Sequence, residues 1–262
     1  MALQEVLQGA VSRLAPPLAH AAVGLSLGDD PPVFAIASAE GVRPMTPDRA
    51  FRAASISKIA TGQAVWAVLK KTPGSADANV SDMLGVDLSH PSGPPITPRQ
   101  LLSHSSGLWD EAGYLMPPGV SLSDWVVSMG PSIWSPDPPG SVYRYCNLGY
   151  ILAAACAERL SGVRFDVLAR RDVLGPAGIE AGFNWTGMSS DARKNGLPCY
   201  RADPMGRQVA QIDDVVAPND ASGPNGETIR LDTGSPGEAA LVLSPQGGLR
   251  ISLENALRLA RA

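Results

Sequence analysis

Proline and glycine are so frequent in this chain that they limit the length of its regular elements. The 262 residues include 27 glycines and 24 prolines, which break helices and strands and favour turns. Long elements are therefore expected only in the windows where these residues are sparse. Apolar residues at helical spacing predict helices in four such windows, and two short apolar runs predict strands joined by a turn. The predicted helices cover 3–14, 55–71, 148–160 and 164–173, and the predicted strands cover 21–27 and 33–39.

The composition is typical of a globular chain, with 44% hydrophobic and 18% charged residues. A net charge of −4 gives no reason to expect nucleic acid or a membrane surface as a partner. Cys146, Cys156 and Cys199 are too few for a disulfide framework, and no spacing of cysteine and histidine resembles a zinc site. The N-terminus does not resemble a signal peptide. We expect a cytoplasmic protein that acts on a small molecule without a metal or cofactor.

A candidate catalytic pair stands at the start of the second helical window. Ser55 and Lys58 are three residues apart, so their side chains share one face of a helix that begins at or just before Ser55. A serine hydroxyl needs a base beside it to become a nucleophile. A lysine amine acts as a base only where burial or nearby positive charge disfavours its ammonium form. The alternative is an ordinary helix start, with Ser55 as N-cap and Lys58 solvated.

A second stretch of interest is Leu101-Leu-Ser-His-Ser-Ser-Gly-Leu108. It follows a short predicted helix in which Thr97 is the N-cap and Pro98 the first residue. His104 could act as a base, but a structural histidine that bonds to a loop backbone is the favoured interpretation.

Four motifs occur in a fixed order along the chain. They are Ser55-Ile-Ser-Lys58, the 101–108 stretch, Tyr145-Cys-Asn147 after Pro139-Gly140, and Gly247-Gly248-Leu249. In this combination the chain resembles the serine β-lactamase/penicillin-binding superfamily. It looks most like the branch with class C β-lactamases, D-Ala-D-Ala carboxypeptidases and family VIII carboxylesterases. The resemblance covers roughly residues 20–262.

The resemblance implies a role for each site residue. Ser55 would be the acylated nucleophile, and its backbone N–H would be one oxyanion donor. Lys58 would take or relay the serine proton, and Tyr145 would be the partner base and later the acid for the leaving group. A phenol needs a cation beside it to do this at neutral pH, and Lys58 is the candidate. Asn147 would bond Lys58 and the acyl amide or ester oxygen of the substrate. The alternatives are a loop aromatic for Tyr145 and a helix N-cap for Asn147.

The same resemblance implies an α/β (α+β) fold, in which an antiparallel sheet is flanked by helices and carries a mostly helical insertion. Residues 1–59 would form the N-terminal part of the α/β domain. Residues 60–180 would form the mostly helical region with Tyr145 and Asn147. Residues 181–262 would form a loop-rich segment and the return helix. Between residues 186 and 236 we expect ordered loop, with strands only in short runs such as 208–216.

The superfamily also carries a third motif, Lys-Thr-Gly or His-x-Gly, and neither follows Tyr145. By comparison with the superfamily, we expect the C-terminal strands and the second oxyanion donor to be missing. The expected function is a serine hydrolase that works through an acyl-enzyme on esters or small amides. The alternative is a catalytically impaired penicillin-binding-like module, or a truncated fragment of such a hydrolase.

Overall fold

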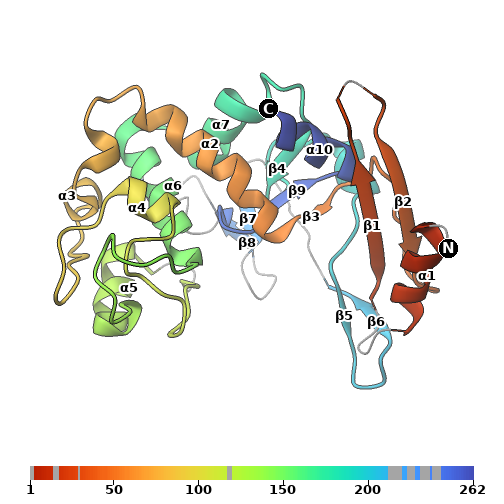
Figure 1. Ribbon diagram of the computed structural model, residues 1–262, viewed down its shortest axis with the longest axis horizontal. Helices are drawn as coiled ribbons and strands as arrows, with labels where there is room; N and C mark the ends of the chain where they lie inside the picture. Colours follow the sequence, from red (N-terminus) through yellow and green to blue (C-terminus); the bar gives the residue numbers. More distant parts are fainter. Residues whose placement is uncertain are drawn as a thin grey trace.

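The structure is a computed structural model that describes residues 3–13, 18–28, 30–116, 120–211, 220–222, 228–230, 237 and 243–262. Its first elements are helix α1 (Leu3–Arg13) and an antiparallel hairpin of β1 (His20–Leu25) and β2 (Val33–Ser38). The Gln4 side chain bonds the backbone N–H and carbonyl of Ile36, which ties α1 to β2. The predicted order of helix, strand and strand is confirmed, and these elements lie at one end of the molecule (Figure 1).

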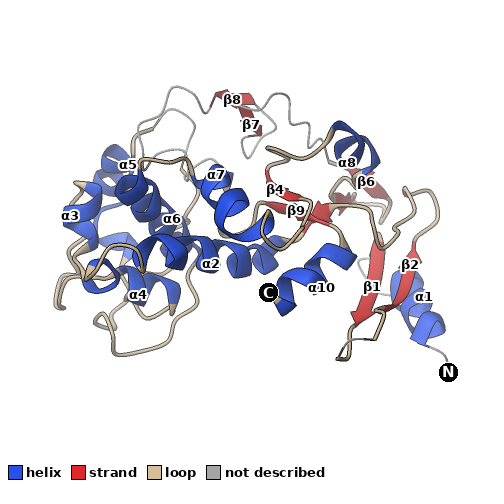
Figure 2. Ribbon diagram, turned by 90° about the horizontal axis from the view of Figure 1, so that it is seen from above, coloured by secondary structure: helices blue, strands red, loops and turns tan. Residues whose placement is uncertain are grey.

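A second, three-stranded sheet unites segments far apart in sequence. Its strands are β3 (Phe51–Arg52), β9 (Leu249–Ile251) and β4 (Ala181–Phe183), in that order, and both pairings are antiparallel. Helix α10 (Leu253–Arg261) follows β9 directly and lies near the hairpin (Figure 2). The prediction of an α/β fold with antiparallel strands and flanking helices is confirmed.

Helices and turns fill the described chain between β3 and β4, apart from an isolated bridge of Leu108 with Trp134. They gather at the end of the molecule opposite the hairpin (Figure 1). The elements are η1 (Ala54–Ile56), α2 (Ser57–Leu69), η2 (Ser75–Asp77), α3 (Val80–Leu84), α4 (Pro98–Leu102), α5 (Leu122–Met129), η3 (Gly130–Ile133), α6 (Asn147–Ser161), α7 (Phe165–Ala169) and the π turn η4 (Arg170–Leu174).

The core of this helical part is α6, in which every residue from Leu148 to Glu158 is buried. Helix α2 packs against α6, so the start of α2 is held on a rigid support. A helix surrounded by other elements on all sides gains most of its stability from such apolar burial. None of the described helices combines the length and the apolar character that crossing a membrane requires.

The details of two helix predictions can be compared with the structure. Helix α4 has the predicted cap: Thr97 accepts a bond from Gln100, and Gln100 accepts one from the Thr97 backbone. In α2 the predicted core residues Ala60, Ala64, Val65 and Val68 are buried. The same prediction is wrong for Ile59, which is 42% exposed. Its position falls outside the stripe that residues 57, 61, 64 and 68 present to the core.

The predicted loop from 186 to 236 contains more regular structure than expected. Helix α8 (Ser190–Asn195) begins after Ser189, whose hydroxyl caps it. A hairpin joins β5 (Tyr200–Ala202) to β6 (Gln208–Ala210), and β7 (Asp220–Ser222) pairs with β8 (Thr228–Arg230). The loop prediction is therefore wrong for α8, whereas the short strands agree with it, and β6 lies in the run 208–216 that it named. The rest of the run 208–216, beyond residue 211, lies outside the described residues.

Candidate active site

Ser55 lies in the tight turn η1 that connects β3 to α2. The turn is fixed from the sheet, because the Ala53 N–H donates to the Leu249 carbonyl at 2.9 Å. Ala54 has φ of +45°, a left-handed conformation that is unfavourable for a residue with a Cβ. Backbone strain of this kind persists only where the surroundings impose it, and it is concentrated at functional sites. The strained turn leaves Ser55 exposed at the start of α2.

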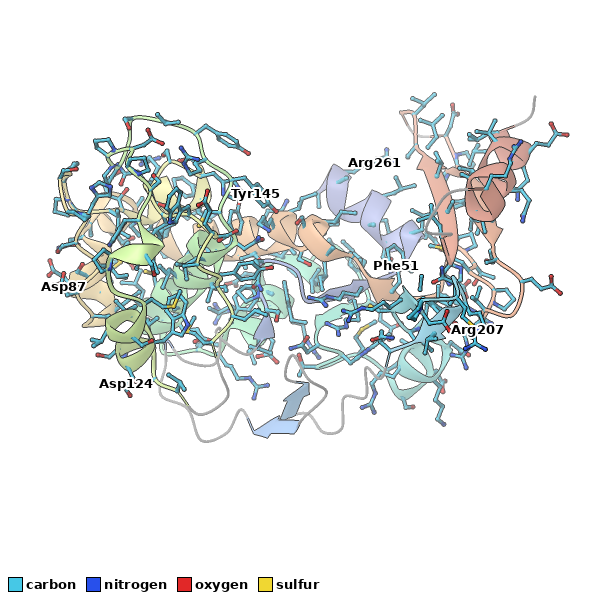
Figure 3. All side chains as sticks on the ribbon, turned by 90° about the horizontal axis from the view of Figure 1, so that it is seen from below. Phe51, Asp87, Asp124, Tyr145, Arg207 and Arg261 are labelled. Atoms are coloured by element: carbon cyan, nitrogen blue, oxygen red, sulfur yellow. The ribbon has the colours of Figure 1, made fainter. Side chains whose placement is uncertain are left out.

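Tyr145 is the nearest described partner of the Ser55 side chain. The two hydroxyl groups lie 2.7 Å apart, which is the distance of a good O–H···O hydrogen bond. Figure 3 shows Tyr145 between the helical part, where Asp87 and Asp124 lie, and the sheet strand with Phe51. The Tyr145 residue is 44% exposed, so small molecules in solvent can reach the pair.

Lys58 lies beneath this pair and is buried, with 8% of its surface exposed. Its Nζ donates to Asn147 Oδ1 at 2.7 Å, to the Gln246 carbonyl at 2.8 Å and to Ser55 Oγ at 3.5 Å. It also lies 4.7 Å from the centre of the Tyr145 ring. An ammonium group has three N–H donors, and three acceptors surround this one. The alternative of a solvated Lys58 is wrong.

Asn147 is the first residue of α6, and the N-cap is Cys146, which offers no side-chain cap. The alternative of Asn147 as N-cap is therefore also wrong. Asp110 from a distant loop supplies the missing cap, accepting from the Asn147 N–H at 2.8 Å and the Leu148 N–H at 3.2 Å. A carboxylate at a helix N-terminus is stabilised by the unpaired N–H groups and the helix dipole.

Sequence reasoning missed Asp110. It lies 37 residues before Asn147, and a cap that comes from another loop leaves no local spacing to detect.

His104 accepts hydrogen bonds from the backbone N–H groups of the residues before and after Tyr145. Its Nδ1 accepts from the Cys146 N–H at 3.1 Å, and its carbonyl accepts from the Arg144 N–H at 2.7 Å. Its ring lies 4.6 Å from the Tyr145 ring at 33°. Burial lowers the pKa of His104, and the positive charge of Lys58 lowers it further. The interpretation of His104 as a structural histidine that bonds a loop backbone is confirmed.

The Gly247-Gly248 turn is anchored to the same helix start. Thr61 Oγ1 donates to the Pro245 carbonyl at 2.6 Å, and the Leu249 N–H donates to Ser57 Oγ at 3.0 Å. These bonds hold the Gln246 carbonyl against Lys58. The structure thus brings together residues from all four sequence motifs.

Cys146, which contacts Asp110, and Cys156, which lies farther along α6, are not suited to nucleophilic chemistry. Burial raises the pKa of the Cys146 thiol to about 12, with the Asp110 charge adding to the effect. Burial likewise raises the pKa of Cys156 to about 12. The reactive form of cysteine is the thiolate. Among the residues that the structure describes, no group of three or more His, Cys, Asp or Glu side chains could hold a metal ion.

Comparisons with known proteins identify a family and solved structures of similar fold. A family model described as Beta-lactamase matches residues 18–262. The chain is 28% identical over 144 residues to "Putative fimbrial assembly protein FimD, serogroup D" of Dichelobacter nodosus, which covers 49% of this chain and 34% of that protein.

Two solved structures share the fold. One is the octameric penicillin-binding protein homologue from Pyrococcus abyssi, with a TM-score of 0.58, 24% identity, and coverage of 82% of this chain and 45% of that one. The other is the D-amino acid amidase from Ochrobactrum anthropi SV3, with a TM-score of 0.67 and 17% identity. That match covers 99% of this chain and 69% of the amidase. The chain thus spans about a third of the curated relative and under half of the Pyrococcus protein.

Proposed function

This chain belongs to the β-lactamase family, and from that membership and the contacts of Ser55 we propose that it is a serine hydrolase. It acts through an acyl-enzyme on esters or small amides. The observation that carries the proposal is the 2.7 Å contact between the hydroxyl groups of Ser55 and Tyr145, with Lys58 beside both. A nucleophile, a base in hydrogen-bond reach and a charged group that orients the base are the parts that acyl transfer needs.

In the first step, Ser55 Oγ attacks the carbonyl carbon of the substrate and its proton passes to the Tyr145 phenolate. The Lys58 ammonium stabilises that phenolate, since an adjacent cation favours the charged form of a phenol. The backbone N–H of Ser55 donates to the oxyanion of the tetrahedral intermediate. When the intermediate collapses, Tyr145 returns the proton to the departing alcohol or amine. The acyl group stays on Ser55.

In the second step, water attacks the acyl-enzyme, with Tyr145 now taking a proton from the water. Asn147 Oδ1 and the Gln246 carbonyl accept hydrogen bonds from Lys58 and hold its Nζ beside the site. Asn147 keeps Lys58 in place and offers its amide to the acyl group of the substrate. When the second intermediate collapses, Tyr145 gives the proton that it took from water to Ser55 Oγ, so the carboxylic acid is released and the Ser55 hydroxyl is restored.

The substrate class rests on the exposure of the site and on the relatives. Ser55 is exposed and Tyr145 is 44% exposed, so the geometry supports small substrates in solvent. One structural relative is named as an amidase and the matching family is named for β-lactamases. Both names refer to cleavage of an amide through its carbonyl carbon, which esters share.

The first test is hydrolysis of p-nitrophenyl butyrate by the full chain and by Ser55→Ala. We expect release of p-nitrophenol that is lost in Ser55→Ala and retained in Ser190→Ala, a matched change at an exposed serine of α8. Equal rates for Ser55→Ala and the parent would reject the proposal.

A second candidate is a penicillin-binding-like module that becomes acylated without turnover. It is favoured by one structural relative, which is named as a penicillin-binding protein homologue. Stoichiometric labelling of Ser55 by a fluorescent penicillin, without product release, would select this candidate.

A further inference from the structure

Asp110 contacts the proposed site in more ways than a helix cap requires. One oxygen, Oδ2, accepts from the Asn147 backbone N–H at 2.8 Å and from the Asn147 side-chain Nδ2 at 2.9 Å. The other, Oδ1, accepts from the Leu148 N–H at 3.2 Å and from the Cys146 thiol at 3.3 Å. The carboxylate therefore accepts hydrogen bonds from both the backbone and the side chain of Asn147.

The bond from Asn147 Nδ2 to Asp110 also determines where Oδ1 of the same amide lies. An asparagine side chain has a donor end and an acceptor end, and rotating it by half a turn exchanges them. With Nδ2 bound to Asp110, Oδ1 faces Lys58, whose Nζ lies 2.7 Å away. The reversed amide would place its NH₂ group against the Lys58 ammonium and its carbonyl oxygen against the Asp110 carboxylate. Both contacts would be repulsive.

We infer that Asp110 is a positioning residue: its carboxylate fixes which end of the Asn147 amide faces Lys58, and so holds the Lys58 ammonium beside Ser55 and Tyr145. This inference rests on the proposed function, which it deepens. Asp110 acts through Asn147, and Lys58 connects that pair to Ser55. Three charge-assisted hydrogen bonds therefore connect Asp110 to Asn147, Asn147 to Lys58 and Lys58 to Ser55. They orient these side chains more strongly than three neutral hydrogen bonds would.

The single variant Asp110→Asn removes the charge and replaces one of the two acceptor oxygens with an NH₂ group. If its remaining oxygen accepts from Asn147 Nδ2, the NH₂ group faces the Leu148 N–H, and if it is reversed, the NH₂ group faces the Asn147 amide. In either orientation one donor loses its acceptor and the bond to Nδ2 is no longer charge-assisted. The exchanged pair, Asp110→Asn with Asn147→Asp, restores the pattern. The amide introduced at position 110 donates to one oxygen of the carboxylate introduced at position 147, and the other oxygen of that carboxylate accepts from Lys58. The pair keeps one negative charge.

The experiment measures how fast a fluorophosphonate probe labels Ser55, because such a probe reports the activation of the serine without needing the acyl contacts of Asn147. We expect Asp110→Asn and Asn147→Asp to label roughly 10–100-fold more slowly than the parent, as the loss of a charge-assisted bond implies. We expect the exchanged pair to recover to within about tenfold of the parent, which a double-mutant cycle reads as coupling. Parent-like labelling of Asp110→Asn, or no recovery in the exchanged pair, would overturn the inference.

Ser121→Ala is the matched control for a purely structural cap. Ser121 accepts from the Asp124 N–H at the start of α5. We expect this variant to melt at a lower temperature but to label at the parent rate. If Asp110→Asn alone does not fold, a folded exchanged pair supports the inference and an unfolded one counts against it.

The parent, the two single variants and the exchanged pair are also compared by thermal denaturation. We expect the changes in melting temperature caused by the two single variants not to add up to that of the exchanged pair, even if the chain does not react with the probe. An unreactive parent with coupled melting would reject the proposed function and keep the inference about Asp110. Additive melting effects would reject the inference whatever the reactivity.

Discussion

The hydroxyl groups of Ser55 and Tyr145 lie 2.7 Å apart although 90 residues separate them along the chain. Lys58, which is only three residues from Ser55, lies farther from the serine oxygen, at 3.5 Å. The nearer partner in space is thus the more distant one in sequence. In the proposed mechanism Tyr145 therefore exchanges the proton with Ser55 directly, and Lys58 supplies the charge that makes this exchange favourable.

Replacing Tyr145 with phenylalanine removes that direct partner and little else, because the ring is partly exposed. General acid–base groups contribute about 10²–10⁴ in rate, so we expect kcat of Tyr145→Phe to fall by that range while KM changes little. The measurement is steady-state ester hydrolysis. Tyr143→Phe is the control, since Tyr143 is 68% exposed and touches His104 by its edge. An unchanged kcat in Tyr145→Phe would contradict the assigned role.

Replacing Lys58 with methionine should affect both activity and stability. The change leaves Asn147 Oδ1 and the Gln246 carbonyl without their donor. An unpaired buried acceptor costs about 1–3 kcal/mol, so we expect a lower free energy of unfolding in urea as well as loss of serine labelling. Lys70→Met, at an exposed position at the end of α2, should change neither. A Lys58→Met chain with parent stability would show that these bonds are weak.

His104 should make stability fall as the pH drops below 6.5, the usual pKa of histidine. Burial, and then the Lys58 charge, lower its pKa below the usual 6.5. The folded state therefore binds protons less readily than the unfolded state, and the stability due to neutral His104 is complete above 6.5 and is lost as pH falls through the lowered folded pKa. Protonation would also remove the Nδ1 acceptor of the Cys146 N–H.

The check is the melting temperature from about pH 5 to 8 for the parent and His104→Asn. We expect the parent to lose stability faster on acidification than His104→Asn. The groups that face the ring are Tyr143, Tyr145, Tyr150, Lys58 and Asp110. His20, whose pKa burial also lowers, is present in both chains and cancels in the comparison. Parallel curves would contradict the expectation.

The two adjacent glycines of the Gly247-Gly248 turn should differ in their tolerance of alanine. A Cβ at Gly248 would lie 2.6 Å from the Leu243 carbonyl oxygen, whereas the nearest atom to a Cβ at Gly247 is 3.8 Å away. We expect Gly248→Ala to lower the free energy of unfolding by about 1–3 kcal/mol, as overpacking does, and Gly247→Ala to leave it nearly unchanged. Urea denaturation of Gly247→Ala and Gly248→Ala measures this difference in the free energy of unfolding. Equal losses would mean that the turn adapts to a Cβ.

Local pattern predicted the elements whose contacts lie within a few residues. The hairpin β1–β2, the Thr97 cap and the glycine end of α6 at Gly162 all depend on short-range spacing and residue type. The loop prediction between 186 and 236 was wrong at α8, since a helix of six residues leaves little periodicity to detect.

The sequence by itself determined that Ser55, Lys58, Tyr145 and Asn147 are the candidates for the site, because Ser55 and Lys58 share a helix face and the four motifs occur in a recognisable order. Only the tertiary structure decided how they meet. It buried Lys58, exposed Ile59, placed the Gln246 carbonyl at the ammonium and brought in Asp110 as the cap of α6. Contacts between distant segments depend on how whole helices pack, and that packing is not recorded in the spacing of neighbouring residues.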